Sequence, residues 1–258
     1  MTEAASQRIL TERRGPILIV TVNRSEAKNA FDGESSLAMN AAMDMLDNED
    51  ELFVGIITGA GGNFSAGADL KAAAKGGPRV RPPRGGFGIM KRPPKKPVIA
   101  AVEGYAVGGG LEMCLACDMI VAASNAKLGL PEVRHNVVAI GGGLFRLPRR
   151  MPYHIVMELA LTGAFKEPAF FQQYGLINRI AEPGKALEEA IKLAESILVN
   201  GPTALAASKE IIFQSPNWQD EEGWAKQMPI AQKALDSEDR REGLKAFAEK
   251  RKPVWKGR

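Results

Sequence analysis

Short apolar runs alternate with amphipathic segments along the first half of the chain. Residues 33–46 place apolar side chains at helical spacing, and a second helix is predicted from the glycine triplet at 108–110 to about residue 116. Four runs have the length and apolar character of buried strands: residues 17–22, 52–58, 98–102 and 119–123. Alternation of strands and helices predicts an α/β core.

Helices dominate the pattern after about residue 142. Helices are predicted at residues 153–161 and 167–174, then a short strand at 177–180, then a helix that ends near residue 199. Beyond Gly201 only helical segments follow. We therefore expect two domains, an α/β core over residues 1–200 and a helical domain over residues 201–258.

Two segments between the early strands do not follow the simple alternation of strand and helix. Residues 64–74 are expected to open a motif and continue into a helix. Residues 76–97 contain six prolines and several glycines, so regular structure is not expected there. A loop of this length inside a compact domain is usually functional or disordered.

Composition limits the class of protein. The chain has 258 residues and a hydrophobic fraction of 45%, enough for one large domain with a full core. No run of eighteen apolar residues occurs, and residues 1–14 lack the apolar stretch of a secretory signal. Cys114 and Cys117 lie within one predicted helix, which fits core packing in a reducing compartment. These features predict a cytoplasmic protein without membrane spans.

Charge is unevenly distributed although the net value is only +4. The segment between Leu70 and Val102 has no acidic residue. Its basic residues are Lys71, Lys75, Arg79, Arg81, Arg84, Lys91, Arg92, Lys95 and Lys96. They indicate either a solvated loop or attraction of a polyanion, which could be a phosphate-bearing small molecule or a nucleic acid.

The glycine triplet is the strongest chemical signal in the chain. It runs directly into an apolar helix, whose first N–H groups are free to stabilise developing negative charge. Glu112 lies just inside that helix, and Glu132 follows the next strand. Apolar neighbours surround both glutamates, which favours partial burial and raised pKa values over ordinary surface carboxylates. Anion-stabilising donors beside two carboxylates predict a site for proton transfer.

Other chemistries fit the sequence poorly. The glycine triplet lacks the spacing of a dinucleotide fingerprint, and no Walker lysine follows any glycine loop. The pair of cysteines lacks the second pair that a zinc site requires. The two histidines have no evident nucleophile partner, which argues against a Ser-His-Asp hydrolase and against a histidine-rich metal site.

At these motifs the chain resembles the crotonase superfamily, the enoyl-CoA hydratase/isomerase group. Phe-Ser-Ala-Gly-Ala-Asp-Leu at 64–70 is similar to its first oxyanion motif, and residues 96–112 are similar to its second. Residues 23–30 and 239–251 resemble the first turn and the C-terminus of the family. The resemblance implies a spiral of ββα units followed by a helical trimerisation domain. It also implies a homotrimer, often assembled as a dimer of trimers.

The same resemblance assigns residues to a substrate. The N–H groups of Ala68 and Gly109 would hold the thioester oxygen, and the carbonyl of Ala66 would read the adenine of coenzyme A. Four further residues are expected to contact the coenzyme A portion: Lys28, Lys71, Phe247 and Lys250. The last two would contact it in their own or in a neighbouring subunit. The basic segment would then face the phosphates of coenzyme A.

The presence of both glutamates favours an enoyl-CoA hydratase within the superfamily. Glu112 is assigned to the attacking water and Glu132 to the proton at Cα, the two acting as a coupled pair. No metal or redox cofactor is expected. Coenzyme A is part of the acyl-CoA substrate and is not counted as a cofactor. Ile140 and the pair Leu144–Phe145 depart from the usual family pattern, which leaves the acyl specificity open.

Two alternatives remain at this stage. One is another reaction of the superfamily, an enoyl-CoA isomerase or a carnitinyl-CoA-type dehydratase. The other is a binding protein that uses the basic segment on RNA. Only Phe87 interleaves those basic residues as a stacking aromatic, which argues against nucleic acid.

Overall fold

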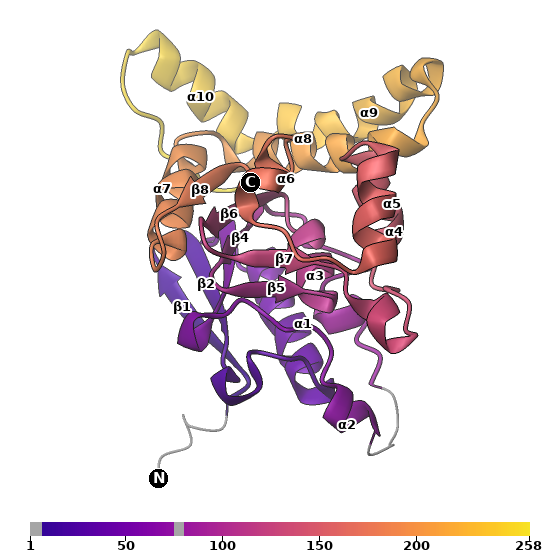
Figure 1. Ribbon diagram of the computed structural model, residues 1–258. Helices are drawn as coiled ribbons and strands as arrows, with labels where there is room; N and C mark the ends of the chain where they lie inside the picture. Colours follow the sequence, from indigo (N-terminus) through magenta and orange to yellow (C-terminus); the bar gives the residue numbers. More distant parts are fainter. Residues whose placement is uncertain (1–6, 75–79) are drawn as a thin grey trace.

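A six-stranded sheet forms the centre of the molecule (Figure 1). The computed structural model describes residues 7–74 and 80–258. Neighbouring strands are parallel except for the first pair, which is antiparallel. The strand order is β1 (Ile9–Arg14), β2 (Ile17–Val22), β3 (Val54–Gly59), β4 (Val98–Val102), β6 (Met119–Ala123) and β8 (Arg179–Ala181).

Helices cover both faces of this sheet, which explains why its strands are continuously apolar. Leu18 and Val20 of β2 belong to the core shared with α1 (Gly33–Asn48) and α3 (Gly109–Ala116). Ile17 and Ile19 point to the opposite face, where α7 (Ala186–Leu198) packs through its alanines. A strand buried on both faces loses the alternation of apolar and polar residues that a half-exposed strand shows.

A second, two-stranded sheet carries the glycine triplet. Its parallel strands are β5 (Tyr105–Val107) and β7 (Lys127–Gly129), and α3 begins two residues after β5 ends. Ser65 forms a parallel bridge with Ala106, and Ala68 forms another with Phe31. The two segments that were predicted to supply oxyanion donors are thereby joined edge to edge.

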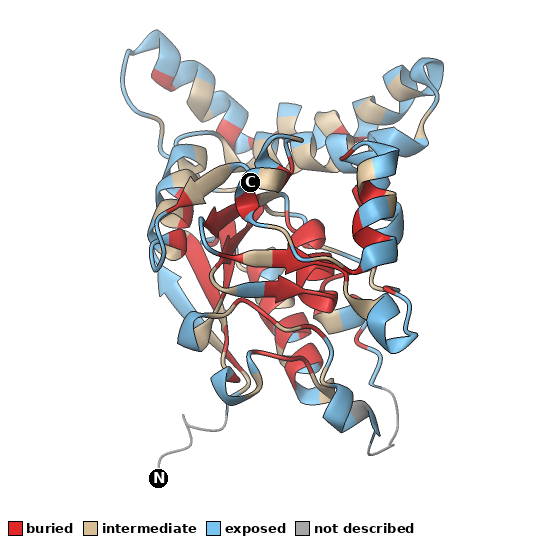
Figure 2. Ribbon diagram, in the orientation of Figure 1, coloured by how far each residue is buried: buried red, intermediate tan, exposed pale blue. Residues whose placement is uncertain are grey.

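The remaining helices lie around this core and beyond it. In Figures 1 and 2 the last three helices extend from the core at the top, and much of their surface is exposed. None of the described helices is both long enough and apolar enough to cross a membrane. The bounds are α2 (Leu70–Ala74), α4 (Gly143–Arg146), α5 (Tyr153–Thr162), α6 (Pro168–Gln172), α8 (Pro202–Gln214), α9 (Asp220–Leu235) and α10 (Glu238–Ala248).

The predicted α/β core and the helical C-terminal segment are confirmed, with local corrections. Strand β1 was not predicted, because it is an edge strand whose side chains are mostly exposed. Strands β5 and β7 were also missed, since three residues are too few for a period to show. As predicted, the segment at 64–74 opens with a non-helical motif, residues 64–69, which bridges to neighbouring segments, and the helix begins at Leu70. The strand expected at 177–180 spans Arg179–Ala181.

Part of the basic segment packs against α1, where the sequence suggested a solvated loop or an anion site. Residues 80–97 of this segment are irregular apart from a 3-10 turn at Gly86–Gly88, while Lys75 and Arg79 lie outside the described residues. The guanidinium of Arg84 is buried and contacts the carboxylates of Asp44 at 2.7 Å and Asp47 at 2.6 Å. Neither interpretation holds for Arg84, which neutralises two aspartates of α1.

Replacement of Arg84 by methionine should therefore destabilise the fold by about 3–5 kcal/mol, because it leaves the nearly buried Asp47 without its cation. Arg92 is the matched control, since its side chain is 61% exposed and lies 4.0 Å from Asp44. Arg92→Met should change the free energy of unfolding by no more than about 0.5 kcal/mol. Denaturant unfolding of both variants measures the difference, and equal effects would contradict the structural role of Arg84.

Candidate active site

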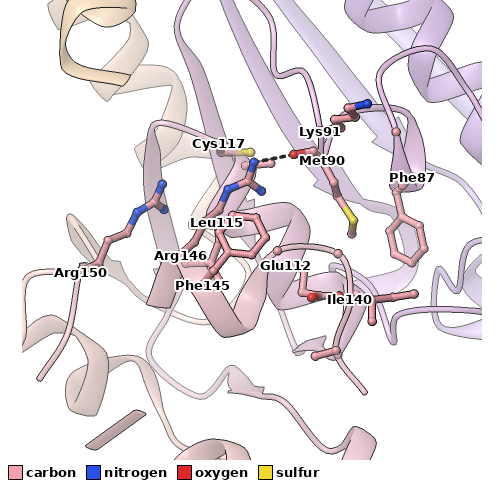
Figure 3. Close-up of a pocket in the computed structure, with 18 of the residues that line it drawn as sticks. Phe87, Met90, Lys91, Glu112, Leu115, Cys117, Ile140, Phe145, Arg146 and Arg150 are labelled. Carbon is pink, nitrogen blue, oxygen red and sulfur yellow. Dashed lines mark hydrogen bonds between the residues drawn. The ribbon is translucent and has the colours of Figure 1, made fainter. Parts of the chain in front are cut away.

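One large cavity opens between the glycine triplet, the segment at residues 85–91 and α8 (Figure 3). Its volume is about 1430 Å³. Ligand cavities in proteins usually measure about 300–1,000 Å³, so this one has room for a large molecule. Five of the predicted site residues line it: Ala66, Ala68, Gly109, Glu112 and Glu132.

Two backbone segments approach each other closely at one wall of the cavity. Gly67 has a φ of +92°, and a Cβ built on it would lie 2.9 Å from the carbonyl oxygen of Val107 and 3.1 Å from the nitrogen of Gly109. A side chain at Gly67 would therefore push the segments apart. No acceptor among the described residues takes the N–H groups of Ala68 or Gly109. The two donors predicted for an oxyanion are thus close in space and free.

The segment that carries Ala68 is held from several sides. Ser65 donates its N–H to the carbonyl of Tyr105 at 2.8 Å and accepts the N–H of Val107 at 3.1 Å. The hydroxyl of Ser65 donates to the carbonyl of Asn29 and accepts the N–H of Gly67. This bonding fixes the donors before any ligand binds, which is what stabilisation of a developing charge requires.

Glu112 is buried in the first turn of α3, with 4% of its surface exposed. Burial raises the pKa of its carboxyl, whereas the N–H groups of residues 141–143 and the positive charge of Arg146 oppose that rise. The N–H of Gly143 donates to Oε1 of Glu112 at 2.9 Å. A Cβ at Gly141 would lie 2.5 Å from Oε2, so glycine is needed for the loop to approach the carboxylate.

Glu132 faces the same cavity from the 3-10 turn Glu132–His135 and is half-buried. Its Oε2 is buried and has no hydrogen-bond partner in the described part of the chain. Burial raises the pKa of this carboxyl, its own backbone N–H opposes the rise, and the negative charge of Glu112 adds to it. The partial burial and raised pKa values that the sequence predicted for both glutamates are confirmed. Glu112 has donors that favour its ionised form, while Glu132 lacks a side-chain partner at Oε2.

The other predicted residues lie at different distances from the cavity. The N–H of Ala66 donates to the carbonyl of Lys28, which places Lys28 beside the mouth, with its ammonium 5.0 Å from the centre of the Tyr105 ring. Lys71 is exposed on α2. Phe247, which is 86% exposed, and Lys250 do not line the cavity of their own chain. Contacts of these four residues with coenzyme A remain predictions.

Sequence reasoning singled out Ile140 but missed the part that Phe87 has in shaping the site. The ring of Phe87 packs on the triplet, since a Cβ at Gly109 would lie 2.5 Å from it, and the ring stacks on Phe31 at 4.3 Å. Phe87 has a φ of +51°, unusual for an aromatic residue. The flanking glycines could have indicated a tight turn, but only the fold shows that this turn meets the triplet. Ile140 is 87% exposed and lies at the cavity (Figure 3).

The cysteines and the acidic residues offer no alternative centre. Cys114 and Cys117 are both free and buried, which confirms that they pack in the core. Burial raises the pKa of the Cys117 thiol to about 12, so it is a poor nucleophile. No three histidine, cysteine, aspartate or glutamate side chains gather as metal ligands in residues 7–74 and 80–258.

Comparison with known proteins shows the family to which a chain with this site belongs. The profile of the enoyl-CoA hydratase/isomerase family matches residues 12–258. The chain belongs to this family. It is 43% identical to the carnitinyl-CoA dehydratase of Salmonella typhi over 264 aligned positions, which cover 98% of this chain and 100% of that protein. The crotonase resemblance drawn from the motifs is thereby confirmed.

Solved structures agree with the assignment. The enoyl-CoA hydratase of Mycobacterium tuberculosis H37Rv is 50% identical, with a TM-score of 0.94 and coverage of 98% of this chain and 100% of that chain. The carnitinyl-CoA hydratase of Mycobacterium avium is 38% identical, with a TM-score of 0.78 and coverage of 98% and 99%. The chain therefore has the fold of an enoyl-CoA hydratase/isomerase. The names of its relatives include both enoyl-CoA hydratase and carnitinyl-CoA hydratase.

The half-buried Glu132 should make the stability of the protein depend on pH. A carboxyl whose pKa rises above its usual 4.5 on folding contributes stability at low pH, which is lost as the pH rises through the folded-state value. Glu132→Gln removes this loss. We expect the variant to melt at a higher temperature than the wild type at about pH 8 and at nearly the same temperature at about pH 4. A melting-temperature difference that is independent of pH would contradict a raised pKa at Glu132.

Proposed function

We propose that this protein catalyses the reversible addition of water across the 2,3-double bond of an enoyl-CoA thioester. The observation that carries the proposal is the convergence of one buried carboxylate, one half-buried carboxylate and two free N–H groups on one cavity. Glu112 and Glu132 supply the carboxylates, and Ala68 and Gly109 supply the donors. Family membership supports a coenzyme A thioester as substrate.

The proposed reaction follows from the different surroundings of the glutamates. The thioester oxygen accepts hydrogen bonds from Ala68 and Gly109, which stabilise the enolate formed when Cβ is attacked. Glu112, whose carboxylate accepts the N–H of Gly143, takes one proton from water while the water oxygen bonds to Cβ. Glu132, whose Oε2 has no partner to stabilise its charge, donates its proton to Cα. One hydrogen and one hydroxyl are added, and the reverse sequence eliminates water.

A second candidate concerns the acyl group within the same class of reaction. Curated relatives named carnitinyl-CoA dehydratase match almost the full length of the chain. Such an activity would use the same two glutamates in the direction of water loss. An isomerase needs only one carboxylate to move a proton between two carbons, so the presence of two in the cavity favours hydration or dehydration over isomerisation.

The proposal extends to the setting of the enzyme. We infer a cytoplasmic homotrimer or dimer of trimers that needs no metal or redox cofactor and binds no nucleic acid. The free, buried cysteines are consistent with a reducing compartment. Apolar side chains exposed on the last two helices support association between copies; among them are Trp224, Met228, Leu244 and Phe247. In such an assembly Phe247 and Lys250 would reach a neighbouring site.

Glutamine at either glutamate tests the mechanism. Glu112→Gln and Glu132→Gln should each lower the rate of hydration by about 10²–10⁴-fold, because each removes one proton-transfer group. Glu195→Gln is the control, since Glu195 is exposed on α7. Loss of the conjugated enoyl-thioester absorbance measures the rate, and titration with a coenzyme A ester should show that binding is retained. A glutamine variant of either site residue that hydrates at the wild-type rate would refute its role.

An alanine at Gly67 tests the anion site. Its methyl group would lie 2.9 Å from the carbonyl of Val107, so the donors of Ala68 and Gly109 would be moved apart. We expect the turnover number to fall by about 10²–10³-fold, the usual cost of losing one oxyanion donor. Gly15→Ala is the matched control, since Gly15 also has a positive φ but has no atom within 4 Å of the added carbon. Equal turnover numbers for the two variants would count against the anion site.

A further inference from the structure

The cavity continues well past the two glutamates. Along α3 it is lined by Glu112 and then by Leu115, Ala116 and Cys117 at the far end of the helix. Five residues of helix correspond to about 7.5 Å. Ile212 and Phe213 of α8, which are 70% and 51% exposed, also line the cavity. We call this apolar-walled extension the inner chamber.

Positive charge is in excess at the inner chamber. Arg146, Arg149, Arg150 and Lys209 line the cavity there, against a single acidic residue, Asp118. Asp118 is already paired with Lys209 at 2.6 Å and accepts the N–H of Val98 at 2.7 Å. In the described part of the chain the three arginines form no ion pair. The negative charges of Glu112 and Asp118 act on Arg146 and Arg150 from a distance. Within the described residues the chamber therefore has guanidinium groups that no carboxylate pairs with directly, beside apolar walls.

Arg146 is the most constrained of these groups. It is only 9% exposed, and its Nη2 donates to the carbonyl of Met90 at 2.5 Å (Figure 3). Its Nη1 is buried and has no hydrogen-bond partner among the described residues. The exposed ring of Phe145 lies over the guanidinium at 5.6 Å. A buried charged donor without an acceptor is unfavourable, and an anionic ligand group would supply the missing acceptor.

We propose that the preferred substrate is an enoyl-CoA whose acyl group has an apolar body and a carboxylate at its far end, held by Arg146 and Arg150. This inference rests on the proposed hydration reaction and specifies its substrate class. The apolar walls match the body of such an acyl group, and guanidinium groups pair with carboxylates through charge-assisted hydrogen bonds. The same charges disfavour an acyl group that ends in a cation.

Three CoA thioesters with ten-carbon acyl chains test the proposal. They are trans-2-decenedioyl-CoA, the same compound with its terminal carboxylate as a methyl ester, and trans-2-decenoyl-CoA. For the wild type, kcat/KM should be at least about tenfold higher for the dioic ester than for the methyl ester, the factor that about 1.4 kcal/mol of extra transition-state binding gives. Arg150→Gln should lower this ratio by about tenfold. Arg179→Gln removes the same charge from β8, outside the cavity, and should leave the ratio unchanged.

Arg146→Met provides a second variant at the buried position. Both esters are measured on one preparation, so a loss of folded protein cancels in the ratio, which should again fall. A wild-type ratio near one, or a ratio that neither Arg150→Gln nor Arg146→Met lowers, would overturn the carboxylate proposal while hydration stands. If the enzyme hydrates none of the three thioesters, the proposed function is contradicted, and with it this inference.

Discussion

Two carboxylates held out of water at the wall of one cavity are the constraint on which the site depends. Burial raises the pKa of both Glu112 and Glu132, and their mutual repulsion adds to the rise for Glu132. The surrounding backbone then distinguishes them. Glu112 accepts the N–H of Gly143, which favours its ionised form, whereas Oε2 of Glu132 has no partner in the described residues. Opposite surroundings for two similar groups are how one site can hold both a base and an acid.

The fold supplies what the carboxylates cannot supply themselves, a fixed place for negative charge. Gly67 and Gly109 approach each other because Ser65 is bonded to β5 on either side of Ala106. Glycine is needed here because a side chain at Gly67 would clash with the backbone of Val107. The loop at residues 139–143 has a similar role at the other wall, where its glycines allow three N–H groups to reach Glu112.

Local sequence features predicted much of this arrangement. The apolar runs indicated buried strands of an α/β core, and the apolar neighbours of Glu112 and Glu132 indicated partly buried carboxylates. Contacts between distant segments could not be read in the same way. The bond from Gly143 to Glu112 joins residues 31 positions apart, and the ion pair of Arg84 with Asp44 joins residues 40 apart. Arg84 and Arg146 look like ordinary basic residues in the sequence, and only packing shows that both are buried.

The central claim is that the two glutamates deliver the elements of water to neighbouring carbons of an enoyl-CoA thioester. Mass spectrometry of the product formed in deuterated, ¹⁸O-labelled water tests it most directly. The account predicts one solvent oxygen at Cβ and one deuteron at Cα in the early product, in equal amounts. A product that contains deuterium but no solvent oxygen, with its double bond moved, would show an isomerase and would contradict the assignment of Glu112 to water.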